Sequence, residues 1–144
     1  MRFWDSSALV PLVVGQPSST EAERWIGEDA EAVTWTLTPV EVASALQRLV
    51  RDGVLPERSA IDAESLAAEL LGHTHVVSDV ERVKPLACRL LRVHPLRAGD
   101  ALQLAAALVW ADGAPNGLVL HTFDRRLAVA AEREGFRVIP TPPA

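Results

Sequence analysis

Short β-branched and aromatic segments alternate with longer helical patterns along this chain, and the alternation limits the fold more than any other feature. The composition predicts strands at 2–4, 32–36, 75–78, 118–122 and 136–139. Apolar residues at helical spacing predict helices at 8–13, 18–28, 38–52, 56–71, 80–93, 100–111 and 125–134. Strands that alternate with helices are typical of a parallel sheet with helices on both faces. We therefore expect a three-layer α/β fold with a sheet of four to five strands, and the helical excess in the middle predicts a helical arm.

Length and composition bound the class of protein. The 144 residues are enough to bury a core, so we expect a single domain over 1–144. The one cysteine, Cys88, fits a reducing compartment and lies in an apolar helical pattern, where we expect it to be buried. The longest apolar run, Leu104–Ala111, is much shorter than a membrane span, and no targeting segment is visible. We expect a cytoplasmic protein without a membrane partner.

Four acidic residues stand where predicted helices begin. Asp5 follows the first strand, Glu41 lies in the first turn after the second strand, and Asp124 follows the strand at 118–122. Asp100 starts the most apolar helix, whose small residues predict a central position. Each acid also has an ordinary explanation as a turn or helix-cap residue, and Thr38 and Glu41 have the spacing of a capping box.

The expected topology favours a joint role for these acids. Right-handed β-α-β connections make the strands parallel, so the strand-to-helix junctions lie at one edge of the sheet. Carboxylates gathered there raise one another's pKa unless a cation offsets their charge. An all-oxygen set suits Mg²⁺ or Mn²⁺, whereas no His and Cys residues have the spacing of zinc ligands. We therefore expect a divalent-metal site at this edge.

The acids lie within four longer motifs: Asp5–Leu9 (DSSAL), Thr38–Leu46 (TPVEVASAL), Leu96–Ala107 (LRAGDALQLAAA) and Thr122–Leu127 (TFDRRL). In order and spacing these motifs resemble the acidic motifs of PIN-domain ribonucleases. The resemblance is strongest to the VapC-type toxins of bacterial toxin–antitoxin pairs, and it covers essentially the whole chain. Pro11, inside the first predicted helix, is one departure from the family pattern.

The resemblance implies a PIN-like fold and Mg²⁺-dependent cleavage of RNA. It assigns catalytic roles to Asp5, Glu41, Asp100 and Asp124, of which Asp5, Asp100 and Asp124 are the implied metal ligands. A supporting hydroxyl falls on Ser7 or Thr122. The resemblance also implies a homodimer and a cognate antitoxin that blocks the cleft.

The positive charges provide candidate contacts to RNA. A net charge of −5 argues against broad nonspecific binding of nucleic acid, but without the four site acids the remainder is near neutral. Arg97, Arg125 and Arg126 lie beside the predicted site and are the candidate phosphate contacts, with Arg89 and Arg92 on the preceding helix.

Other functions and roles remain open at this point. The chain could be a PIN nuclease that processes RNA outside a toxin–antitoxin pair, or a catalytically silent PIN binding module. A receiver-like phosphoacceptor domain is disfavoured, because the only lysine, Lys84, lies in a helix. We expect the tryptophans, Trp4 included, to be core or interface residues, and the His73 and His75 pair to lack further metal ligands.

Overall fold

The computed structural model describes all residues, Met1–Ala144, and contains five strands and seven helices. In chain order they are β1 (Arg2–Trp4), α1 (Ser6–Val13), α2 (Ser19–Glu28), β2 (Ala32–Trp35), α3 (Thr38–Arg51), α4 (Glu57–Leu71), β3 (His75–Val77), α5 (Val80–Val93), α6 (Ala98–Trp110), β4 (Val119–His121), α7 (Arg125–Glu134) and β5 (Arg137–Ile139). Every predicted strand and helix is present, with boundaries shifted by a few residues. Helix α1 runs through Pro11, which is buried.

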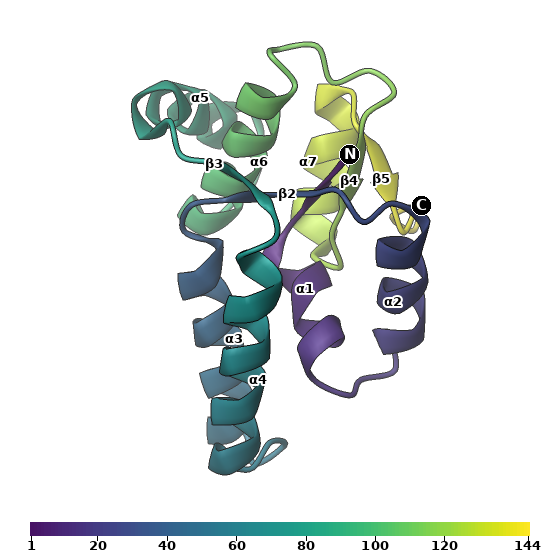
Figure 1. The fold of residues 1–144 in the computed structure, drawn as a ribbon. Helices are drawn as coiled ribbons and strands as arrows, with labels where there is room; N and C mark the ends of the chain where they lie inside the picture. Colours follow the sequence, from purple (N-terminus) through teal and green to yellow (C-terminus); the bar gives the residue numbers. More distant parts are fainter.

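The five strands form one parallel sheet in the order β3-β2-β1-β4-β5 (Figure 1). Strand β1 is central, with Phe3 paired to Val33 on one side and to Leu120 on the other. All strands run the same way, so their carboxyl ends share one edge. This strand order differs from the 2-1-3-4-5 order of receiver-like folds, which rules out the receiver alternative.

Helices cover both faces of the sheet, as predicted. Because successive strand residues point to opposite faces, Phe3 packs into one core cluster and Trp4 into the other. The first cluster centres on α6, whose small buried residues such as Ala105 and Ala106 allow close packing. The second gathers residues of α1, α2, α3 and α4. Helix α6 therefore occupies the central position that its composition predicts.

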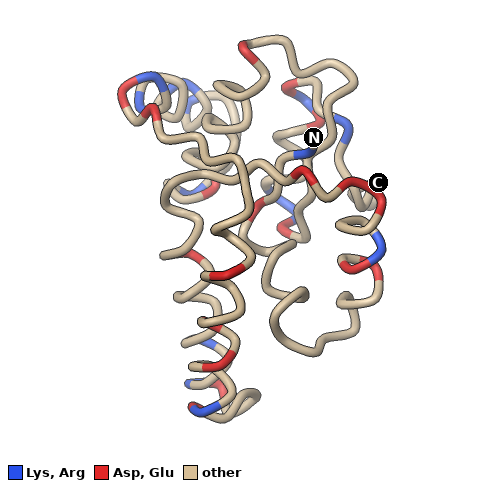
Figure 2. Tube along the Cα trace, viewed as in Figure 1, with Lys and Arg blue, Asp and Glu red and all other residues tan.

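Helices α3 and α4 pack side by side and extend beyond the sheet as an arm (Figure 1). Gly53 follows α3 with a φ of 71°, in the left-handed region that glycine adopts readily. Acidic and basic residues are interspersed along this arm and along α5, with no single-sign face in the view of Figure 2. No helix combines the length and apolar character needed to cross a bilayer.

The expectation that Cys88 is buried is wrong, because its side chain is exposed. Helix α5 buries Val83, Ala87 and Leu90, which lie on one face, and this register turns Cys88 outward. Trp4, Trp25 and Trp35 are buried in the core, as expected. The remaining tryptophan, Trp110, is partly buried and packs against the core around α6.

Candidate functional site

A cavity of about 470 Å³ opens at the edge of the sheet where β1, β2 and β4 end. All four predicted acids line it: Asp5, Glu41, Asp100 and Asp124. The predicted RNA contacts Arg97, Arg125 and Arg126 line it as well. The fold therefore brings together acids that are up to 119 residues apart in the sequence.

Asp5 is the most enclosed of the acids, at 4% exposure. It follows β1 directly and caps α1, accepting a hydrogen bond from the Ser7 amide at 3.2 Å. Its Oδ2 also accepts from the hydroxyls of Ser7 and Thr122, the latter at 2.8 Å. Its Oδ1 has only a long contact of 3.4 Å, from the Ser6 hydroxyl. One oxygen is thus held by the protein while the other is largely free.

The two predicted supporting hydroxyls, of Ser7 and Thr122, both contact Asp5 and also hold the loop after β4. The Ser7 hydroxyl accepts from the Phe123 amide at 2.9 Å, and the Thr122 hydroxyl accepts from the Asp124 amide at 3.0 Å. The two hydroxyls are 3.1 Å apart. Through them the position of Asp124 is tied to that of Asp5.

Glu41 is held by neighbours from other helices. Its Oε2 accepts from the Ser6 hydroxyl at 3.1 Å and from the Gln103 amide at 3.1 Å. The capping-box explanation for Thr38 and Glu41 is wrong: Thr38 is already helical, and its hydroxyl accepts from the Trp35 amide instead. Freed from a capping role, the carboxylate turns toward the cavity.

Asp100 and Asp124 lie at the starts of α6 and α7 and do act as helix caps. Asp124 accepts from the Leu127 amide at 2.8 Å, and Asp100 accepts from the Arg97 amide at 3.3 Å. Asp100 is two residues inside α6, which begins at Ala98 rather than at Asp100. For these acids, capping and a place in the cavity coexist, because the helix starts converge there.

The acids perturb one another. Burial raises the pKa of Asp5, and the charge of Asp124 adds to this rise. Burial also raises the pKa of Glu41, with further contributions from Asp5 and Asp100. The pKa of Asp100 is raised by burial and then by the charges of Asp124 and Asp5. These mutual effects are those of carboxylates gathered close together.

The chemistry of the donors fits a hard divalent cation. Carboxylate and hydroxyl oxygens are the ligands that Mg²⁺ and Mn²⁺ prefer, and the largely free Oδ1 of Asp5 offers one such donor. As the side chains stand, no three His, Cys, Asp or Glu residues form a ready-made ligand cluster. A cation bound here would keep several waters as ligands, as Mg²⁺ commonly does in proteins.

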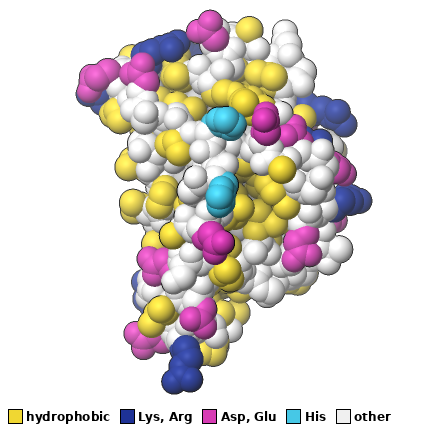
Figure 3. Space-filling model, viewed as in Figure 1, with side chains coloured by type: hydrophobic (Ala, Val, Ile, Leu, Met, Phe, Trp, Pro, Cys, Tyr) yellow, Lys and Arg dark blue, Asp and Glu magenta, His cyan; other side chains and the backbone are white.

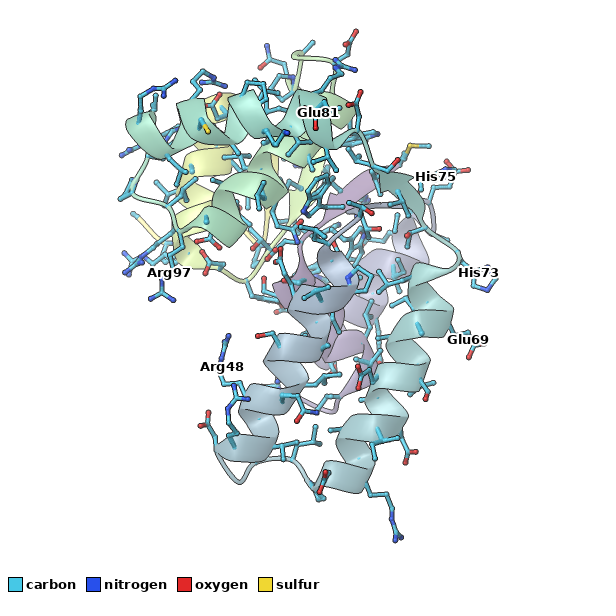
Figure 4. All side chains as sticks on the ribbon, turned by 90° about the vertical axis from the view of Figure 1, so that its left-hand side faces the viewer. Arg48, Glu69, His73, His75, Glu81 and Arg97 are labelled. Carbon is cyan, nitrogen blue, oxygen red and sulfur yellow. The ribbon has the colours of Figure 1, made fainter.

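Four arginines surround the acids: Arg48, Arg97, Arg125 and Arg126. None of them forms a salt bridge, although four carboxylates line the same cavity. Arg48 on α3 and Arg97 before α6 lie on either side of the same concave region in Figure 4. Unpaired guanidinium groups around a cavity favour an anionic ligand such as phosphate.

Sequence reasoning missed Arg48 and Gln103, and it overrated Arg89. Arg48 lines the cavity because it lies on the same face of α3 as Glu41, seven residues earlier. Gln103 lies three residues after Asp100, so helical spacing was the available signal. Arg89 instead pairs with Glu134 at 3.1 Å.

The remaining polar candidates lie elsewhere. His73 precedes β3 and His75 is its first residue, and both are exposed at a distance from the labelled arginines (Figure 4). Arg92, at the end of α5, is exposed and does not line the cavity.

Comparisons with known proteins agree with this architecture. The family model of the PIN domain matches residues 2–139. Ribonuclease VapC45 of Mycobacterium tuberculosis is 38% identical over 139 residues, which cover 96% of this chain and 94% of the relative. Ribonuclease VapC47 of the same species is 30% identical over 141 residues, covering 94% of this chain and 93% of the relative.

Solved structures share the fold at lower identity. The crystal structure of M. tuberculosis VapC20, described as a sarcin-ricin loop cleaving toxin, matches with a TM-score of 0.65 and 21% identity, covering 90% of this chain and 95% of that one. A toxin–antitoxin complex from Klebsiella pneumoniae matches with a TM-score of 0.66 and 16% identity, covering 100% of this chain and 97% of that one.

Proposed function

This chain belongs to the PIN-domain family, and from that premise we propose that it is a Mg²⁺-dependent endoribonuclease, the toxin of a type II toxin–antitoxin pair. The relatives that share 38% of its residues are named ribonucleases of the VapC type. The observation that carries the proposal is the cavity itself, in which four carboxylates are ringed by arginines without salt bridges.

In this proposal Asp5, Asp100 and Asp124 hold the metal ion. The Ser7 and Thr122 hydroxyls keep Oδ2 of Asp5 engaged, which orients its other oxygen for a ligand. When bound, Mg²⁺ supplies positive charge to the phosphodiester and activates water as the nucleophile. The chain then needs no nucleophile of its own.

Glu41 orients the attacking water in this mechanism. Gln103 and Ser6 occupy its Oε2 and fix the carboxylate, and no protein group bonds to its Oε1. Its raised pKa brings it closer to the range in which a carboxylate accepts a proton from water. Arg48, Arg97, Arg125 and Arg126 bind the phosphates of the substrate.

Substitution of the acids tests this function. We expect purified protein to cleave single-stranded RNA with Mg²⁺, to stop with EDTA, and to lose at least about 100-fold in rate in Asp5→Asn and in Asp100→Asn. Asp62→Asn, on the exposed side of α4, is the matched control and keeps the wild-type rate. Metal-independent cleavage, or equal cleavage by Asp5→Asn, would contradict the mechanism.

Thermal unfolding tests the metal site without any cleavage. Since a ligand that binds the folded state raises its stability, Mg²⁺ should raise the Tm of the wild type and of Asp62→Asn. The rise should be smaller in Asp5→Asn. A folded wild type that binds Mg²⁺ yet cuts no RNA would instead favour the silent binding module.

We further propose a homodimer and a cognate antitoxin as protein partners. Large hydrophobic side chains are exposed along the arm, among them Val40, Val54, Ile61 and Leu66. Figure 3 shows hydrophobic atoms along α4 and between α4 and α2. Light scattering on the purified protein should give twice the monomer mass. A small reading frame next to this gene would separate a toxin from an RNA-processing nuclease.

A further inference from the structure

A second, smaller cavity of about 220 Å³ lies beside the first, and we propose that it binds a backbone phosphate of the RNA next to the phosphate that is cleaved. One wall is a face of α7 that carries Arg126, Val129 and Arg133, and the other is formed by His94 and Pro95. We call this cavity the α7 groove. The proposal rests on the proposed ribonuclease function.

The α7 groove is adjacent to the catalytic cavity. Arg125 and Arg126 line both of them, so a strand that leaves the acids along α7 enters the groove directly. Arg133 lies seven residues beyond Arg126, which is about 10 Å along a helix. A short stretch of single-stranded RNA spans such a distance, so one strand can contact the acids and Arg133 together.

The groove is positively charged and contains no acid. Its charged lining residues are arginines, and none of the three forms a salt bridge. Glu134, next to Arg133 in the sequence, does not line the groove. Its carboxylate contacts Arg89 at 3.1 and 3.3 Å, and His94 Nε2 at 2.7 Å. The Glu134 carboxylate is therefore engaged by other groups, and Arg133 remains available.

The size and lining of the groove select the chemical class of the ligand. Its volume is below the roughly 300–1,000 Å³ of pockets for drug-sized molecules, so it suits one small group. Guanidinium groups match the geometry of phosphate oxygens and bind them in pairs of hydrogen bonds. Val129, Ala130 and Pro95 add apolar surface to the walls, against which the attached ribose can pack. A phosphodiester fits this combination.

Arg133 is the residue on which to test the groove, because it lines the groove and not the catalytic cavity. Arg58 is the matched control, since it is an exposed arginine without a salt bridge on the arm. We would measure binding of a labelled single-stranded RNA by fluorescence anisotropy in EDTA, across a salt series. Each lost phosphate contact lowers the salt slope by about 0.7, so Arg133→Ala should weaken binding about 5- to 10-fold near 0.05 M salt.

An RNA in which an uncharged linkage replaces one phosphodiester can locate the phosphate that the groove binds. RNAs with a single methylphosphonate should show one position, beside the cleaved bond, that weakens binding by the wild type and by Arg58→Ala but not by Arg133→Ala. Equal binding by wild type, Arg133→Ala and Arg58→Ala would overturn the proposal. The proposal would also be overturned if Arg133→Ala changed competition by inorganic phosphate but left the binding of RNA unchanged. Because the measurement needs no cleavage, a wild type that cuts no RNA refutes the proposed function separately.

Discussion

The carboxylate of Glu41 is held in place by a side chain from another helix, Gln103 of α6. Gln103 is buried on α6 and donates to the Glu41 carboxylate and, at 3.4 Å, to the Thr38 hydroxyl. Its Oε1 is buried without a partner, a feature that costs about 1–3 kcal/mol in folded proteins. A buried amide retained at such a cost favours a role for Gln103 as a positioning residue for Glu41.

Replacing Gln103 by Leu tests that role. The Gln103 hydrogen bond lowers the pKa of Glu41, so its loss should raise this pKa and move the acid limb of the rate–pH profile to higher pH. We expect kcat to fall about 10-fold or more with little change in KM, as expected for a misplaced general base. Gln47→Leu, exposed on α3, is the control. An acid limb that does not move would reduce Gln103 to a packing residue.

Among individual residues, the sequence predicted the four acids better than the side chains that position or surround them. Asp5 and Asp124 were predictable because each lies between a strand and the helix that follows it, and parallel strands end at one edge. Gln103 and Arg48 were not, because their roles depend on which helix face meets the cavity. Helical spacing places Gln103 near Asp100 and Arg48 near Glu41 on the helix surface. Only the orientation of each helix shows that this surface meets the cavity.

Helix α7, which presents Arg125 and Arg126, is ended by Gly135. This glycine has a φ of 111°, and a Cβ there would lie 2.8 Å from Oδ1 of Asn116. Gly135→Ala should therefore lower the free energy of unfolding by about 1–3 kcal/mol. Gly27→Ala, inside α2 with open space around it, should be neutral or stabilising by up to about 1 kcal/mol. Urea unfolding of both variants tests this prediction, and equal changes in their free energies of unfolding would contradict it.

Helices and strands were predictable where the residue pattern is compatible with only one kind of element. The brief strand at His75–Val77 was predicted and completes the sheet. The exposed face of α5 was predicted wrongly at Cys88. Lys84 and Arg92, four residues before and after Cys88, mark a polar face that helical spacing already shows. The opposite face, with Val83 and Leu90, packs against α6.

His121 links several elements across the molecule. Its ring lies 4.4 Å from that of Trp4 and 4.9 Å from that of Trp25, measured between centroids. Its Nδ1 contacts the Ile139 carbonyl at 3.2 Å, and its Nε2 is 3.4 Å from the Arg2 guanidinium. Burial lowers the pKa of His121 to about 4, with the Arg2 charge acting in the same direction.

Acidification should therefore destabilise the protein through His121. The unfolded chain binds this proton more readily than the folded one, so the free energy of unfolding falls as the pH drops from about 6.5 to about 4. The loss reaches about 3 kcal/mol, from 1.36 kcal/mol per pKa unit. The raised pKa values of Asp5, Glu41 and Asp100 act in the opposite direction as these acids protonate.

Comparison with His121→Phe isolates the histidine, because the variant keeps a ring between the tryptophans and leaves the acids in place. Chemical denaturation of both proteins between pH 4 and pH 6.5 should give a shallower loss of stability in the variant. If stability fell equally with pH in both proteins, the loss would arise from groups other than His121.

Asp5 and Asp124 each cap a helix and line the cavity, and this double use separates the evolution of the fold from that of the activity. Asparagine caps a helix about as well as aspartate, but its side chain carries no charge for a cation. Codons for the two residues differ by one base. Under the proposed mechanism, a single transition at either position would silence the nuclease and leave a folded chain. Lineages that no longer need the activity have a short mutational path to a binding module.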